Sequence, residues 1–200
     1  MSSARTADLE VQASAHRLNT DSSYTRTAIV LHWLIALCIL GQILFGVYLE
    51  EIPRGTPARS WYVNLHKSTG ITLGLLIVFR LFWRLRHTPP PLPNSIPAWQ
   101  RIAAGVSHWS LYACMLIMPL SGYIASNFSK WGVKFFNAVS LPPWGIEDKN
   151  IYAFFNGTHV ITSYVLIALI AAHLIGALSH AVARDGIFGR MWFKADRTTR

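Results

Sequence analysis

Charged residues and cysteines are both scarce in this chain of 200 residues. Only 14% of the residues are charged, whereas soluble globular domains carry about 25%. The two cysteines, Cys38 and Cys114, each lie inside an apolar stretch, and no C-x-x-C pair occurs. This usage excludes a disulfide framework and a thiolate metal site, so both cysteines are expected to be small buried residues.

Hydrophobic residues supply 52% of the chain and gather in four runs. Each run is long enough to cross a bilayer, which takes about 20 residues of helix. The predicted spans are 29–48, 65–82, 106–124 and 158–182. A Pro-rich segment, "HTPPPLPNSIP", separates the second span from the third, because proline cannot continue a helix. The sequence therefore predicts an all-α integral membrane protein, an antiparallel up-down-up-down four-helix bundle.

The segments outside the spans are polar. Residues 1–25 lack the apolar stretch of a secretory signal and are expected to form a flexible tail. The four-span domain is predicted to cover residues 26–190, and a basic tail follows at 191–200.

The basic residues indicate how the bundle is oriented. Four spans place both termini and the Pro-rich connection on one side of the membrane. Of the 18 Lys and Arg residues, 12 lie on that side and 6 on the other. The six are Arg54, Arg59, Lys67, Lys130, Lys134 and Lys149. The positive-inside rule therefore predicts that both termini are cytoplasmic, and it accounts for the net charge of +9 without nucleic acid as a partner.

Four histidines recur at two depths of the predicted bundle. His159 and His173 are 14 residues apart in the fourth span, so they share one face and differ in height by about 21 Å. His66 begins the second span at the depth of His159, and His32 begins the first at the depth of His173. The antiparallel arrangement therefore predicts two pairs, His66 with His159 near the outer face and His32 with His173 near the inner face.

Two facing imidazoles form a natural axial set for haem iron. Each histidine taken alone has an alternative, an interhelical hydrogen bond. A flat macrocycle also needs small residues beside it, and glycines lie at the outer depth on three of the spans: Gly46, Gly70 and Gly122. The pattern predicts one haem iron at each depth, with these glycines making room at the outer one.

Three further polar residues lie near the predicted inner site. Arg80 is 14 residues beyond His66, and an intramembrane guanidinium is costly unless it is paired. It is expected either to pair with haem propionates or to extend to the headgroups. His180, seven residues beyond His173, could hydrogen-bond a quinone carbonyl or a propionate, or simply lie in the interface. His108 is expected to be an interhelical or cofactor contact.

Five short motifs follow one another through the four spans: "VLHWLI", "NLHKSTGITLGLLIVFRLFWRL", "TPPPLP", "MPLSGY" and the H-x13-H of the last span. In this order and at these spacings they resemble the bacterial cytochrome b561 family, over residues 23–190. The resemblance implies two b-type haems in a four-helix bundle that exchanges electrons with membrane quinone. The family's ligand positions match His32, His66, His159 and His173.

The resemblance also implies a place and a role. The chain is expected in the bacterial inner membrane, passing electrons between the periplasmic face and ubiquinone or menaquinone. Because no C-x-x-C-H occurs, the haems are expected to be non-covalent. Similar cytochromes serve as quinone-linked subunits of dehydrogenases or hydrogenases, and some oxidise superoxide. Both roles stay open, with superoxide or a periplasmic redox protein as the donor.

A histidine-lined metal transporter is an alternative of another class. Such a protein needs acidic or thiolate ligands along a path through the bundle. None of the four predicted spans contains a carboxylate, so the sequence favours the cytochrome.

Overall fold

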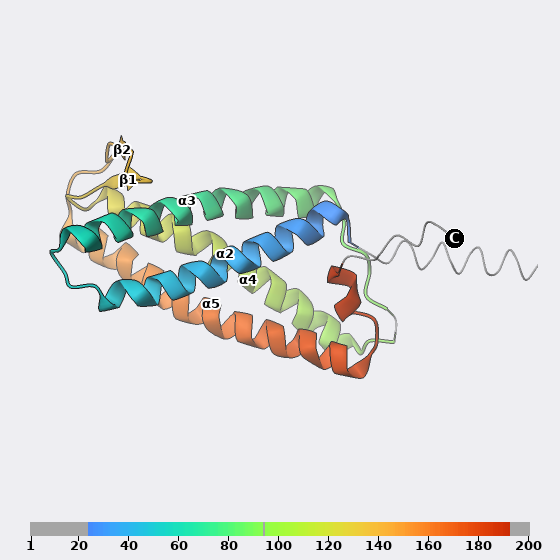
Figure 1. The fold of residues 1–200 in the computed structure, drawn as a ribbon. Coiled ribbons are helices and arrows are strands. Elements are labelled where there is room, and N and C mark those ends of the chain that lie inside the picture. The colour runs from blue at the N-terminus through green and yellow to red at the C-terminus, as the bar shows by residue number, and fades with distance from the viewer. Residues whose placement is uncertain (1–23, 94, 193–200) are drawn as a thin grey trace, which may run out of the picture.

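The computed structural model describes residues 24–93 and 95–192, which form long helices, a β-hairpin and a short 3-10 helix (Figure 1). The helices are α2 (Arg26–Glu51), α3 (Pro57–Arg86), α4 (Ala98–Asn127) and α5 (Lys149–Ala183). The strands are β1 (Val133–Phe135) and β2 (Val139–Leu141), and the 3-10 helix η1 is Phe188–Met191. Most of the predicted flexible tail, residues 1–23, and most of the basic tail, residues 193–200, lie outside the described residues.

Four helices in the described part of the chain, of 26, 30, 30 and 35 residues, are long and apolar enough to cross a membrane. Consecutive helices run in opposite directions, so the connections alternate between the two ends of the bundle (Figure 1). We call one end the hairpin end, because it carries β1 and β2. The other is the terminal end, where α2 begins and α5 ends. The predicted four-span helical bundle is therefore confirmed.

The helices are longer than the predicted spans because capped polar segments extend them beyond the apolar runs. Helix α3 begins at Pro57, where the Thr56 side chain accepts a hydrogen bond from an amide of the first turn. Helix α5 begins after Asp148, whose carboxylate accepts hydrogen bonds from the amides of Asn150 and Ile151. Both caps lie at the hairpin end.

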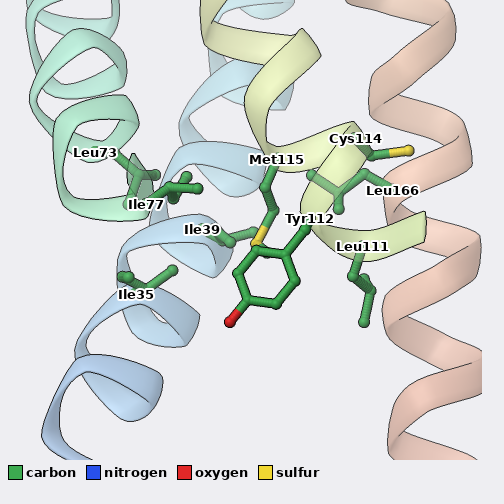
Figure 2. Close-up of a cluster of buried hydrophobic side chains, with 9 residues drawn as sticks. All are labelled: Ile35, Ile39, Leu73, Ile77, Leu111, Tyr112, Cys114, Met115 and Leu166. Carbon is green, nitrogen blue, oxygen red and sulfur yellow. The ribbon is translucent and has the colours of Figure 1, made fainter. Parts of the chain in front are cut away.

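The most tightly packed part of the bundle lies partway along its length (Figure 2). Nine buried side chains from all four helices meet there: Ile35, Ile39, Leu73, Ile77, Leu111, Tyr112, Cys114, Met115 and Leu166. Cys114 is buried, as expected, whereas Cys38 is only partly buried. Leu166 lies midway between His159 and His173 along α5, so this core separates the two levels at which the histidines occur.

Many large apolar side chains outside this core are exposed. Leu37 of α2, Leu75 of α3 and Val182 of α5 are 66%, 68% and 84% exposed. Soluble monomers rarely expose large contiguous apolar surfaces, whereas a bilayer covers them. These side chains therefore form the surface that faces lipid.

The loop between α4 and α5 contains a hairpin that the sequence did not predict. Strands β1 and β2 pair antiparallel, with Phe135 opposite Val139. Three residues, Phe136 to Ala138, connect the strands, and the first two, Phe136 and Asn137, have φ of 46° and 57°. Asn and Gly are the residues that usually adopt this left-handed conformation. Phenylalanine is unusual at the first turn position, so the sequence carries no recognisable turn signal here.

Candidate functional site

The first histidine pair lies at the hairpin end. His66 projects from α3 and His159 from α5, and their ring centroids are 6.3 Å apart with the planes at 83°. The two rings border a pocket that is lined otherwise by Gln42 and by apolar residues.

His159 is held by the backbone of α4. Its Nδ1 lies 2.8 Å from the carbonyl oxygen of Met118. A carbonyl oxygen only accepts, so Nδ1–H donates, and Nε2 of the neutral ring keeps a lone pair for a metal. Gly122, one turn further along α4, faces the same ring, and a Cβ there would lie 2.9 Å from Nδ1. The His159 ring thus lies against Gly122, and a macrocycle beside this glycine stays a prediction.

His66 is positioned differently. Its Nδ1 is buried and has no hydrogen-bond partner among the described residues. Gln42 of α2 donates from Nε2 to the His66 carbonyl and to the Thr69 hydroxyl, at 3.1 and 2.9 Å. A Cβ on Gly46 would lie 3.7 Å from Cε1 of the His66 ring, whereas a Cβ on Gly70 would meet Nε2 of Gln42 at 3.3 Å. Gln42 was not among the predicted site residues, although a lone amide in an apolar span was a usable signal.

The second pair lies at the terminal end. The ring centroids of His32 on α2 and His173 on α5 are 6.3 Å apart, with the planes at 65°. His108 of α4 lies next to them, 5.5 Å from His173 between centroids, which fits the expected interhelical contact. The structure thus brings together the same two pairs of rings that the helix depths suggested.

Arg80 lies inside the bundle beside this second pair. Its Nη2 is 3.1 Å from Nδ1 of His32, and the guanidinium lies over the Tyr112 ring at 5.6 Å from the centroid. Arg84 approaches the same ring at the same distance. Two cationic groups therefore converge on the Tyr112 ring, and one of them, Arg80, also contacts His32.

His180 lies beyond the second pair, one helical turn before the end of α5. Its Nδ1 is 2.5 Å from Oδ2 of Asp185, which follows the left-handed Arg184 that ends the helix. Desolvation alone would raise the pKa of the Asp185 carboxyl, but the hydrogen bonds from His180 and from the Ile187 amide outweigh it and lower that pKa. The bonds to the ionised carboxylate therefore stabilise the fold above the ordinary pKa of 3.8, and this contribution is lost only as the pH falls through the lowered value.

The segment after α5 folds back over the terminal end. The Met191 carbonyl accepts a hydrogen bond from the indole of Trp33, the neighbour of His32, at 2.8 Å. The guanidinium of Arg190 donates to the carbonyls of Pro90 and Pro91 at 2.9 and 3.0 Å. Sequence reasoning missed these contacts, because they join segments more than 95 residues apart through backbone acceptors.

Both pairs have the separation expected of two axial ligands on one metal. A metal about 2 Å from one nitrogen of each ring sets the ring centroids about 6 Å apart. Both pairs measure 6.3 Å. Within the described residues, no group of three or more His, Cys, Asp or Glu side chains is arranged to hold a metal ion. A two-ligand site suits a metal that brings its other ligands with it, and the residues present therefore fit haem iron.

Comparison with known proteins identifies the family of the chain. The model of the family described as "Prokaryotic cytochrome b561" matches residues 23–194, which is most of the chain. The chain belongs to the prokaryotic cytochrome b561 family. Membership confirms the resemblance and implies that this multi-pass bacterial membrane protein binds haem b.

Three relatives extend the comparison. The chain is 30% identical to cytochrome b561 homolog 2 of Escherichia coli strain K12, over 88% of this chain and 95% of the relative. It is 29% identical to cytochrome b561 homolog 1 of the same organism, over 84% and 96%. It is also 27% identical to the probable superoxide oxidase CybB of Yersinia pestis, over 84% and 94%. All three similarities cover almost the whole length of the relative.

Proposed function

We propose that this cytochrome carries two haems b and passes electrons between the membrane face at the hairpin end and the quinone pool. The observation that carries the proposal is the repetition of one ligand geometry at two levels, with centroid separations of 6.3 Å in both pairs. His66 and His159 would hold one haem, and His32 and His173 the other. Held between two imidazoles, each haem iron would supply one-electron transfer and keep no open position for a substrate.

Arg80 supports a propionate-bearing group at the terminal end. A guanidinium only donates, so its contact with His32 makes Nδ1 the acceptor and leaves the proton of the neutral ring on Nε2. A metal ligand at Nε2 requires the other tautomer. Arg80 would therefore turn to a different acceptor in the loaded protein, and a carboxylate accepts more strongly than an imidazole. We assign Arg80 to a haem propionate.

We propose that the terminal end faces the cytoplasm and that the protein lies in the inner membrane. The excess of Lys and Arg on the side of the termini supports this orientation. The hairpin end then faces the periplasm, where the electron donor approaches.

We propose that quinone, ubiquinone or menaquinone, binds at the terminal end beside His180. A quinone enters from the bilayer but exchanges protons with water, so its site must lie near the headgroups. His180 is about 10 Å past His173 along α5 and is hydrogen-bonded to a carboxylate. The His180–Asp185 pair can hold a proton at Nδ1 and exchange it with water.

Superoxide is the electron donor that the comparisons favour, because one relative is a probable superoxide oxidase. The reaction balances without another reagent. Two superoxide anions each lose one electron and become two molecules of oxygen, and the two electrons with two protons reduce one quinone to a quinol. The other candidate role, a quinone-linked subunit of a dehydrogenase or hydrogenase, uses the same haems with a protein donor.

Rapid mixing without oxygen distinguishes these roles. We expect superoxide to reduce the haems of the purified protein. Quinone added afterwards should reoxidise them. The measurement is the haem absorption spectrum after each addition. Reduction by quinol but not by superoxide would indicate the subunit role, and a protein that neither reagent reduces would refute the proposed function.

The variant His180→Ala is expected to leave the haem spectrum intact and to slow electron exchange with quinone by about a hundredfold, the lower end of what a positioned proton-transfer group contributes. Asp185→Asn should cause part of this loss, because it removes the charged partner of His180. Ser179→Ala is the matched control, since Ser179 is the exposed neighbour on the same turn. Unchanged quinone kinetics in His180→Ala would remove His180 from the quinone site, and loss of haem would make it a structural residue.

A further inference from the structure

The hairpin at the end of the bundle is attached to one face of α3 (Figure 1). Asn64 and Ser68, one turn apart on α3, accept hydrogen bonds from the amides of Lys134 and Phe136, at 3.2 and 2.7 Å. Lys67 donates from Nζ to the Gly132 carbonyl at 2.9 Å. The backbone of β1 is therefore bonded along the α3 helix rather than held above the bundle.

These contacts lie at the depth where hydrocarbon meets the headgroups. Arg84 marks the basic rim of α3 at the terminal end, and Ser68 precedes it by 16 residues, or about 24 Å of helix. Asn64 precedes it by 20 residues, or about 30 Å. The hydrocarbon core of a bilayer is about 30 Å thick. Asn64 thus lies at the boundary of the core and Ser68 about 6 Å inside it, and the hairpin bonded to them lies at this depth.

The hydrogen bonds on α3 suit this position. Backbone groups at membrane depth must find partners within the protein, because lipid provides none. The Ser68 side chain is fully buried and forms two hydrogen bonds with backbone groups. Its hydroxyl donates to the Asn64 carbonyl and accepts from the Phe136 amide. Asn137 donates from its side chain to the Trp61 carbonyl at 3.1 Å. The turn of the hairpin is therefore bonded to α3 by main chain and side chain together.

The turn also exposes an apolar side chain at the expense of backbone strain. Phe136 has φ of 46°, a conformation that costs free energy for a bulky residue, yet its side chain is 46% exposed. Val139 on β2 is 57% exposed. Lys130, just before the hairpin, and Lys134, within β1, are both exposed and carry the charge that lipid phosphates attract.

We propose that residues 132–141 form an interfacial hairpin, embedded in the lipid leaflet at the hairpin end of the bundle. Phe136 and Val139 contact the upper acyl chains, and Lys130 and Lys134 lie among the headgroup phosphates. The lipid-facing surface of the four spans continues onto the hairpin, which shields Lys67 and Ser68 from the acyl chains. This inference does not depend on the proposed electron-transfer function or on which side of the membrane the hairpin end faces.

An environment-sensitive fluorophore tests the proposal. It is attached to Phe136→Cys and, separately, to Val139→Cys in the haem-loaded protein, reconstituted in liposomes of zwitterionic and anionic phospholipid. The matched control is Glu147→Cys, an exposed charged position in the loop before α5. The wild-type protein, with Cys38 and Cys114 in the spans, measures background labelling.

Labels at 136 and 139 are expected to emit at shorter wavelength than the label at 147. Lipids with a nitroxide on the upper acyl chain should quench them several times more strongly, and aqueous iodide should quench them several times more weakly. Equal iodide quenching at the three positions would place the hairpin in water and overturn the proposal. Protection from both quenchers would overturn it as well, because the hairpin would then be covered by protein. The haem spectrum of each variant verifies its fold. If one of the two labelled variants does not fold, the other still gives the result.

Discussion

Replacing His66 or His159 by alanine is expected to lower the haem content from about two per chain to about one. In the proposed arrangement both rings would hold the haem at the hairpin end, and one imidazole alone would hold a non-covalent haem weakly. His32→Ala and His173→Ala are expected to remove the other haem. The measurement is the pyridine haemochrome per mole of protein, with a redox titration to identify which haem remains.

Double variants test the pairing itself. His66→Ala with His159→Ala should lose no more haem than either single change, because both residues serve one site. His66→Ala with His32→Ala should lose both haems. His87→Ala is the control, since His87 stacks on Trp83 at 4.0 Å between centroids, away from both pairs. A wild-type protein with about one haem per chain would contradict the two-site arrangement, and one retained haem in His66→Ala with His32→Ala would contradict the pairing.

The fold and the histidine levels could be predicted from sequence because lipid imposes simple requirements. A run of about 20 apolar residues nearly always forms a membrane-spanning helix. Four such runs joined by short connections form an antiparallel bundle. Helix geometry then converts sequence spacing into depth, so 14 residues between His159 and His173 suffice to match His66 and His32. These inferences need only the period and rise of a helix.

The groups that orient the histidines could not be predicted from sequence. They are backbone carbonyls, or side chains that a reversal of the chain brings close. Any residue at position 118 offers a carbonyl, so nothing in the sequence identifies Met118 as the partner of His159. Asp185 reaches His180 only because the chain reverses at Arg184 in a left-handed conformation. The hairpin depends in the same way on a strained turn at Phe136. Sequence patterns predict the helices well. They do not predict the contacts between residues of different helices and loops.

Gly122 provides the sharpest test of how the His159 ring is held. A Cβ at this position would lie 2.9 Å from Nδ1 and 3.1 Å from Cε1 of His159, closer than carbon and nitrogen atoms pack. The ring cannot yield without lengthening its 2.8 Å hydrogen bond to Met118, which fixes the tautomer that leaves Nε2 free. Gly122→Ala is therefore expected to displace His159 and to lose most of the haem at the hairpin end, leaving about one per chain.

A matched pair of controls separates this clash from the general effect of adding a methyl group. Gly105→Ala on α4 and Gly157→Ala on α5 place the new Cβ where no atom lies within 4 Å. Alanine favours a helix interior over glycine by about 1 kcal/mol, so both controls should retain two haems and unfold at an equal or higher temperature. Alanine favours the helix at position 122 as well. Loss of haem in Gly122→Ala therefore cannot be attributed to a less stable helix. Retention of both haems in Gly122→Ala, with an unchanged spectrum at the hairpin end, would show that the His159 ring can move without cost and that the Met118 carbonyl does not position it.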